Sequence, residues 1–234
     1  MNTSHQQIYS TAYKSRPLRH PENKELSLSY DGSYRNVPVQ TKRGPMIINY
    51  LDGLNETIER QLKQYAKVFA VRVDLYFPAD WNESKRLSLD YYSRFMDSLK
   101  AKLAAFDYRK AQAGDSRSNT VRFCRVYEIG ESRGLHIHAV LLFNGHIFRS
   151  LGNYSSSDEN LYHRINAAWG SALQLFPAEV SSQGLVHFNK PFYIEGRTDR
   201  SEKVRQLFTH SAYICKADTK RFNRPVKVFS RSRS

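Results

Sequence analysis

The sequence is short of cysteine and of long apolar runs, and each shortage excludes a class of protein. Two cysteines occur among 234 residues, which excludes a secreted domain built on disulfides and predicts reduced thiols. No apolar run reaches membrane-spanning length, and the first residues lack the apolar core of a signal peptide. We therefore expect a cytoplasmic protein with no membrane partner.

Acidic residues are also scarce relative to basic ones. The chain carries 36 Lys and Arg against 22 Asp and Glu, a formal net charge of +14 and a sequence pI near 9.8. A field of this sign attracts phosphate backbones and makes binding depend on salt. Aromatic residues make up 13% of the chain, and exposed ones can stack on unpaired bases. We therefore predict a nucleic-acid partner.

Glycine-rich phosphate loops and zinc-finger spacings are missing from the sequence. Their absence excludes an ATP-driven helicase half, so unwinding of duplex DNA would need a separate helicase. The length suits one domain of ordinary size. We divide the chain into a basic, loosely ordered or draping arm (1–45), a folded domain (46–218) and a basic tail (219–234). The tail has no acid after Asp218, which predicts a phosphate-contacting or disordered end.

Hydrophobic periodicity predicts an alternation of helices and strands. Helices are expected over 47–66, 88–112, 158–176 and 201–220, with Asp158 capping the third. Strands are expected over 68–77, 121–129, 135–143, 185–188 and 192–194. These elements pack most economically as an α+β sandwich, with a mainly antiparallel central sheet flanked by helices.

The segment 135–143 is an apolar strand that begins with a histidine pair. Because side chains alternate along a strand, His136 and His138 share one face while Ile137 points to the other. The two imidazoles are close enough to hold one metal ion, and a buried polar pair needs such a partner. The alternative is a core histidine that bonds to a neighbouring backbone group.

A third ligand is expected from the strand before the histidines. Residues 130–134 are polar and bounded by glycine, which predicts a hairpin turn. If Ile129 faces Leu135, Glu128 lies opposite His136 on the same face, whereas a slip of one residue would turn Glu128 away. Glu131 in the turn and His187 on a late strand are the alternatives. Two imidazoles and a carboxylate suit Mg²⁺ or Mn²⁺, and also Zn²⁺.

The last predicted helix carries a tyrosine that can act as a nucleophile. Tyr213 lies opposite the apolar stripe of this helix, and Lys216 follows one turn later. A phenol needs a nearby cation or metal ion to react as phenolate. The alternative is an amphipathic tyrosine at a helix edge.

A histidine pair on a strand, followed by a helix with Tyr-x-x-Lys, resembles the HUH endonuclease superfamily of rolling-circle replication initiators and relaxases. Residues 69–77 are similar to the early core strand of that superfamily. Further similarities point to the replication proteins of filamentous phages and their prophage relatives, the inovirus gene II-like or YagK/YfjJ-like family. They are Val71-Arg72-Val73-Asp74, Ala167-Ala168-Trp169, Gly184-Leu185-Val186-His187-Phe188 and Tyr213-Ile214-Cys215-Lys216.

The resemblance implies a ferredoxin-like or RNA-recognition-like core that nicks single-stranded or hairpin origin DNA in a bacterial host cell. In that reaction, Mg²⁺ or Mn²⁺ held by the His136–His138 pair and Glu128 polarises a phosphate, and Tyr213 attacks it. The products are a 5′-phosphotyrosine and a free 3′-hydroxyl that starts rolling-circle replication. Lys216 would stabilise charge. The expected DNA contacts are Arg72, Arg133, Lys220 and Arg221.

Two other classes of function remain open from the sequence. One is a DNA- or RNA-binding regulator that uses the sheet as a platform and performs no chemistry. The other is a zinc-dependent hydrolase in which the histidine pair holds a water-activating ion and Tyr213 is incidental. The role of Arg72 is also undecided from the sequence, since its side chain can contact DNA or pair with Asp74 on its own strand.

Overall fold

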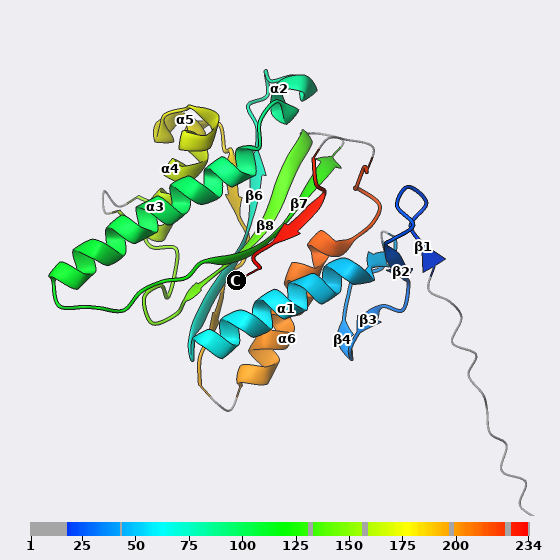
Figure 1. The fold of residues 1–234 in the computed structure, drawn as a ribbon, viewed down its shortest axis with the longest axis horizontal. Helices are drawn as coiled ribbons and strands as arrows, with labels where there is room; N and C mark the ends of the chain where they lie inside the picture. Colours follow the sequence, from blue (N-terminus) through cyan, green and yellow to red (C-terminus); the bar gives the residue numbers. More distant parts are fainter. Residues whose placement is uncertain are drawn as a thin grey trace, which may run out of the picture.

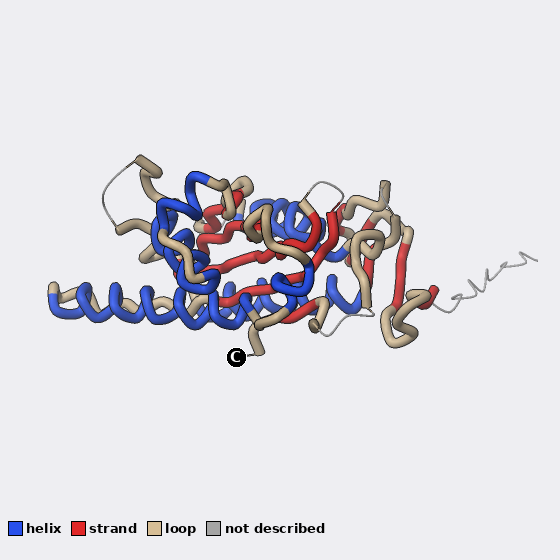
Figure 2. The backbone as a smooth tube through the Cα atoms, turned by 90° about the horizontal axis from the view of Figure 1, so that it is seen from above, coloured by secondary structure: helices blue, strands red, loops and turns tan. Residues whose placement is uncertain are grey.

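A computed structural model describes residues 18–42, 44–130, 133–155, 159–196, 199–222 and 226–233. Its centre is a six-stranded antiparallel sheet with helices on both sides (Figures 1 and 2). The strand order is β10-β6-β8-β7-β11, and β9 also pairs with β6. The strands are β6 (Val68–Tyr76), β7 (Arg122–Gly130), β8 (Gly134–Asn144), β9 (Val186–Phe188), β10 (Phe192–Ile194) and β11 (Phe229–Arg231).

The middle of the chain follows the β-α-β-β-α-β order of a ferredoxin-like fold. Helix α3 (Tyr91–Gln112) connects β6 to β7, and α4 (Leu161–Leu173) connects β8 to β9. Strand β8 lies between β6 and β7 and is antiparallel to both. The predicted α+β class, with an antiparallel sheet flanked by helices, is therefore confirmed.

Alternation along the strands creates two apolar cores. On β6, Val71, Val73 and Leu75 face the core beneath α3 and α4. Val68 and Ala70, on the other face of β6, pack with α1 (Ile48–Gln64) and α6 (Arg200–Ser211). Helices α1 and α6 lie side by side on this face (Figure 1). The predicted histidine pair belongs to the α1 side of the sheet.

Two predicted helix starts need correction. The helix expected from residue 88 begins at Tyr91, because the Asp90 side chain accepts a hydrogen bond from the Ser93 amide at 3.0 Å. A short helix not expected from the sequence, α2 (Glu83–Leu87), precedes it. Helix α4 is capped by Asn160, which accepts from the His163 amide at 3.1 Å. The predicted cap Asp158 lies outside the described residues.

The described part of the expected N-terminal arm contains short strands. They are β1 (Leu18–Arg19), β2 (Ser27–Ser29), β3 (Ser33–Tyr34), β4 (Val37–Pro38) and β5 (Met46–Ile47). Strand β2 pairs with β5 directly before α1, and Leu28 and Val39 are buried in the core beside α1. This segment therefore lies against the domain.

The predicted basic tail contains a strand, β11, so the expectation of a disordered end is wrong for residues 229–231, whereas its expected contact with phosphate stays a prediction. Strand β11 pairs with β7, with Phe229 opposite Val126. The Phe229 ring stacks on Tyr50 of α1 at a centroid distance of 4.4 Å. The tail therefore extends the sheet and covers the edge of β7. Among the described residues, no helix combines the length and apolar character needed to span a membrane.

Candidate metal and nucleophile site

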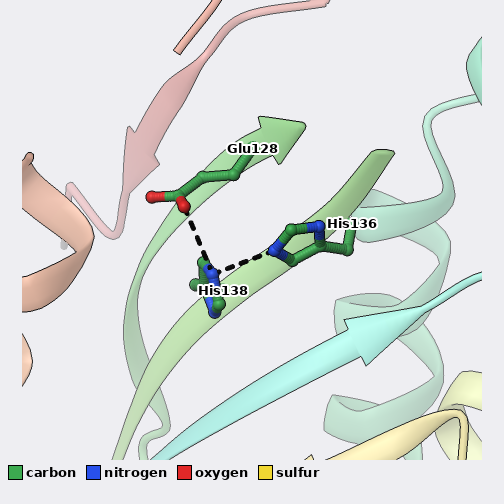
Figure 3. A group of neighbouring side chains, drawn as sticks. All are labelled: Glu128, His136 and His138. Carbon is green, nitrogen blue, oxygen red and sulfur yellow. Dashed lines mark hydrogen bonds and ion pairs between the residues drawn. The ribbon is translucent and has the colours of Figure 1, made fainter. Parts of the chain in front are cut away.

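Strands β7 and β8 form the hairpin that brings the predicted ligands together. Their register pairs Ile129 with Leu135 and Glu128 with His136, so the predicted register is confirmed. Figure 3 shows Glu128 on β7 pointing toward the two imidazoles on β8. All three side chains lie on one face of the sheet. The two histidines are two positions apart on β8, so they point the same way, and Glu128 lies directly opposite His136 on β7.

The three side chains form a tight, buried cluster. The Nε2 atoms of His136 and His138 are 3.1 Å apart, and His138 Nε2 lies 3.4 Å from Glu128 Oε2. Each residue is at most 8% exposed. Within the described part of the chain, these three form a group of His, Cys, Asp and Glu side chains whose ligand atoms lie within 4.8 Å of one another.

A second layer of residues orients these ligands. His136 Nδ1 lies 2.9 Å from the Gly134 carbonyl oxygen, and His138 Nδ1 lies 2.5 Å from Asp74 Oδ1. Both contacts assign the Nδ1–H as donor and leave the Nε2 lone pairs facing each other. Lys220 Nζ donates to Glu128 Oε1 at 2.6 Å, which leaves Glu128 Oε2 for the imidazoles.

The ionisable groups shift each other's pKa values. Burial alone would raise the pKa of Glu128, but the Lys220 ammonium and His138 lower it below its usual range. Burial lowers the pKa of His136 more than its bond to Gly134 raises it. Burial also disfavours charged His138, yet its hydrogen bonds to Asp74 and Glu128 raise its pKa overall. The site thus holds anionic carboxylates around a pair of imidazoles.

The donor atoms fit a divalent cation. With metal–ligand bonds of about 2.0–2.2 Å, neighbouring ligand atoms are separated by about 2.8–3.1 Å in octahedral geometry and by about 3.3–3.6 Å in tetrahedral geometry. The separation of 3.1 Å between the two imidazole nitrogens lies at the upper octahedral limit, and the separation of 3.4 Å between His138 and Glu128 lies in the tetrahedral range. Two facing lone pairs also require a positive charge between them, from a proton or a metal ion. His136, His138 and Glu128 are therefore the residues that would hold the ion.

Tyr213 lies beside the cluster, although not in the predicted element. The helix expected over 201–220 ends at Ser211, and a 3-10 turn (Ala212–Cys215) carries Tyr213. Lys216 then adopts an extended conformation, because its backbone bridges to Met46 of β5. The Tyr213 ring meets the His138 ring edge-on, with centroids 5.8 Å apart.

Two cations flank the Tyr213 ring. Lys216 Nζ lies 3.7 Å from the ring centroid, and the Arg72 guanidinium carbon lies 4.7 Å from it. Such contacts hold a ring by cation–π attraction and place positive charge next to the phenol. Tyr213, the three ligand residues and Arg72 line one cavity of about 900 Å³.

A partly buried polar network connects Tyr213 to the candidate metal ligands, and it includes a residue that the sequence did not single out. Asn189 donates to Asp74 Oδ2 at 3.1 Å and accepts from Arg72 Nη2 at 2.5 Å. Arg72 Nε is 3.5 Å from Asp74 Oδ1, so the pairing of Arg72 with Asp74, open from the sequence, is formed. No local pattern around Asn189 signals this role, because its partners are more than 100 residues away.

The four predicted DNA contacts separate into two groups. Arg72, Arg133 and Arg221 line the cavity, where they can meet a phosphate. Lys220 does not, because its side chain is completely buried and paired with Glu128. The prediction of Lys220 as a DNA contact is therefore corrected. The burial follows from the backbone, since the amide of Ile129 on β7 donates to the Thr219 carbonyl at 3.2 Å and holds residue 219 against the sheet.

The structure also distinguishes between the residues predicted as alternatives for the third ligand. His187 on β9 is exposed and pairs with Asp74 in the sheet register, but it is outside the cluster of candidate ligands. Glu131 lies outside the described residues. Glu128 is the carboxylate that the described structure places at the histidines.

Fold and site together define an α+β protein with a buried His–His–Glu cluster at the end of a central hairpin. The chain belongs to the YagK/YfjJ C-terminal domain family, whose match covers residues 31–232. It is 31% identical to the uncharacterized protein YagK of Escherichia coli K12 over 201 residues, 81% of this chain and 95% of YagK. It is also 31% identical to the uncharacterized protein YfjJ of the same strain over 189 residues, 76% of this chain and 90% of YfjJ.

A solved structure with partial similarity is the N-terminal nuclease domain of minute virus of mice non-structural protein 1. The sequence identity is 14%, the alignment covers 70% of this chain and 71% of that one, and the TM-score is 0.22. A likeness at that TM-score carries no argument about function.

Proposed function

We propose that this protein is a metal-dependent endonuclease that nicks single-stranded DNA through a covalent bond to Tyr213. The observation that carries the proposal is the position of Tyr213, whose ring contacts His138 of the candidate metal cluster in a shared cavity. A zinc hydrolase needs no phenol at this point, and a binding platform needs neither the phenol nor the cluster.

The residues supply the parts of a phosphodiester transfer. The bound ion would be Mg²⁺ or Mn²⁺, acting as a Lewis acid on the scissile phosphate. Lys216, which is 2% exposed and is not among the residues that line the cavity, stabilises the phenolate from its position against the Tyr213 ring. Arg72, which lines the cavity, stabilises the negative charge of the phosphate. The Tyr213 oxygen attacks phosphorus, its proton passes to solvent, and the P–O3′ bond breaks. The products are a 5′-phosphotyrosine and a 3′ oxygen that takes up a proton to become a hydroxyl.

The biological setting is part of the same proposal. A free 3′-hydroxyl primes synthesis, so the reaction fits initiation of rolling-circle replication at a single-stranded or hairpin origin in the bacterial cytoplasm. A separate host helicase would unwind the duplex. With Tyr213 as the one tyrosine that matches the motif, the cycle must be completed by water, a second subunit or another group.

The first prediction is a covalent adduct between the protein and DNA. Incubation with labelled single-stranded and stem-loop oligonucleotides and Mn²⁺ or Mg²⁺ should yield a band that survives denaturing electrophoresis. Tyr213→Phe and excess chelator should each abolish the band, because they remove the attacking oxygen and the Lewis acid. His136→Ala should weaken metal binding and lower the yield by at least about 100-fold. The control Tyr108→Phe, on the opposite side of the sheet, should behave like the wild type.

Other outcomes would support the other classes. Tight DNA binding without cleavage of any oligonucleotide in the library would favour the regulator. Hydrolysis that persists in Tyr213→Phe but disappears in His136→Ala would favour the zinc hydrolase.

A further inference from the structure

A second cavity adjoins the metal-site cavity. It has a volume of about 620 Å³ and shares the side chains of Tyr76 and Arg133 with the first cavity. Both volumes fall within the range of about 300–1,000 Å³ that is typical of small-ligand sites. The remaining lining residues are Phe77, Ala79, Arg86, Gly134, Gln183 and Leu185.

The lining of this second cavity suits a nucleobase next to a phosphate. It contains two arginines, two aromatic rings and one amide, and no carboxylate. Arg133 lies over the Tyr76 ring, with its guanidinium carbon 4.4 Å from the centroid. The same ring is 5.4 Å from the ring of the ligand His136. A flat base can stack on the guanidinium plane or replace it over the ring.

The wall of the cavity is held in place before any ligand binds. Arg86 donates to the Arg133 carbonyl at 2.9 Å and to the Pro78 carbonyl at 3.2 Å, which ties the end of β6 to the hairpin turn. The Tyr76 amide donates to the Leu185 carbonyl at 2.8 Å. A preorganised wall lowers the entropy cost of binding.

We propose that the second cavity binds the base of the nucleotide next to the scissile phosphate, with Tyr76 and Arg133 as its stacking pair. The inference rests on the proposed function for the choice of single-stranded DNA as ligand. It assigns Tyr76 a role through its ring, because that ring lies between the Arg133 guanidinium, 4.4 Å from its centroid, and the His136 imidazole, 5.4 Å from it.

The test is equilibrium binding of a fluorescent single-stranded oligonucleotide, followed by anisotropy in the Tyr213→Phe background so that no adduct forms. Loss of one stacked base corresponds to roughly a 5- to 150-fold weakening, and we expect about ten-fold for Tyr76→Ala. Tyr76→Phe should bind within about two-fold of its parent, since the ring remains. Tyr108→Ala, an exposed tyrosine on α3, is the matched control.

Tyr76→Leu keeps apolar volume and tests whether Tyr76→Ala fails only through misfolding; it should show the same weakening with an unchanged melting temperature. Normal binding by folded Tyr76→Leu, or equal loss in Tyr76→Phe, would overturn the stacking role. Adduct formation by otherwise wild-type protein is measured separately. If the adduct forms but binding does not depend on Tyr76, only the proposed base site is contradicted. If binding depends on Tyr76 but no adduct forms, only the proposed nickase activity is contradicted. If the Tyr213→Phe parent does not bind the oligonucleotide, both proposals are contradicted.

Discussion

Lys220 is a buried ammonium that lies next to the candidate metal ligands. Its side chain is 0% exposed and contacts Glu128, which is 2% exposed, at 2.6 Å. Burying either charge alone is costly, whereas the pair compensates both. The role of Lys220 is therefore to neutralise and orient the Glu128 carboxylate.

Replacement of Lys220 by methionine should lower the free energy of unfolding by about 3 kcal/mol, because Glu128 then remains buried without its cation. Urea denaturation followed by circular dichroism measures this loss. The double variant Glu128→Gln/Lys220→Met should recover most of the stability, since neither partner is charged. Lys100→Met, at an exposed position of α3, should change stability by less than about 0.5 kcal/mol. A Lys220→Met protein as stable as the wild type would contradict this role.

At the scale of elements, α1 approaches β11 closely at a glycine. A Cβ atom on Gly53 would lie 2.9 Å from two ring carbons of Phe229. That ring is stacked on Tyr50 of the same helix, so it has little freedom to move away. The contact connects the C-terminal strand to the first helix.

Substitution of Gly53 by alanine should therefore destabilise the protein, although alanine is the better helix former by about 1 kcal/mol. We expect a net loss of about 1–3 kcal/mol in thermal or urea unfolding, as for overpacked cores. Lys63→Ala, at an exposed position of α1, should stay within about 0.5 kcal/mol. In the double variant with Phe229→Leu, the loss should be smaller than the sum of the two single losses. Stabilisation by Gly53→Ala would show that β11 does not pack on α1 in this way.

At the scale of the whole molecule, the charge of +14 predicts that the proposed binding to DNA depends on ionic strength. The dissociation constant for single-stranded DNA should rise linearly on a double logarithmic plot against salt, with a slope of about 0.7 per phosphate contact. Anisotropy titrations between 50 and 200 mM salt measure this slope. Arg221→Ala, at a position that lines the cavity, should reduce it by about one contact, whereas Lys100→Ala should not. A slope near zero would contradict an electrostatic contact with the DNA backbone.

The local pattern of the sequence predicts the hairpin that carries the candidate ligands. A polar, glycine-bounded turn between two apolar strands favours antiparallel pairing, and Glu128 opposite His136 is one register that this pattern allows; the structure selects it over a slip of one residue. The α+β class follows from the order of helices and strands, because the periodicity of apolar residues identifies each element locally. Interactions between near neighbours in the chain favour these features.

Only the tertiary structure placed Asp74, Asn189 and Lys220 around the ligands. Their partners lie 64, 115 and 92 residues away in the chain, so no local spacing reports them. The same holds for the shortened tyrosine helix and for β11, where a basic tail finds a sheet edge and an apolar partner on α1. Periodicity describes which side of an element is apolar, whereas long-range pairing decides where the element ends and which buried charge meets which.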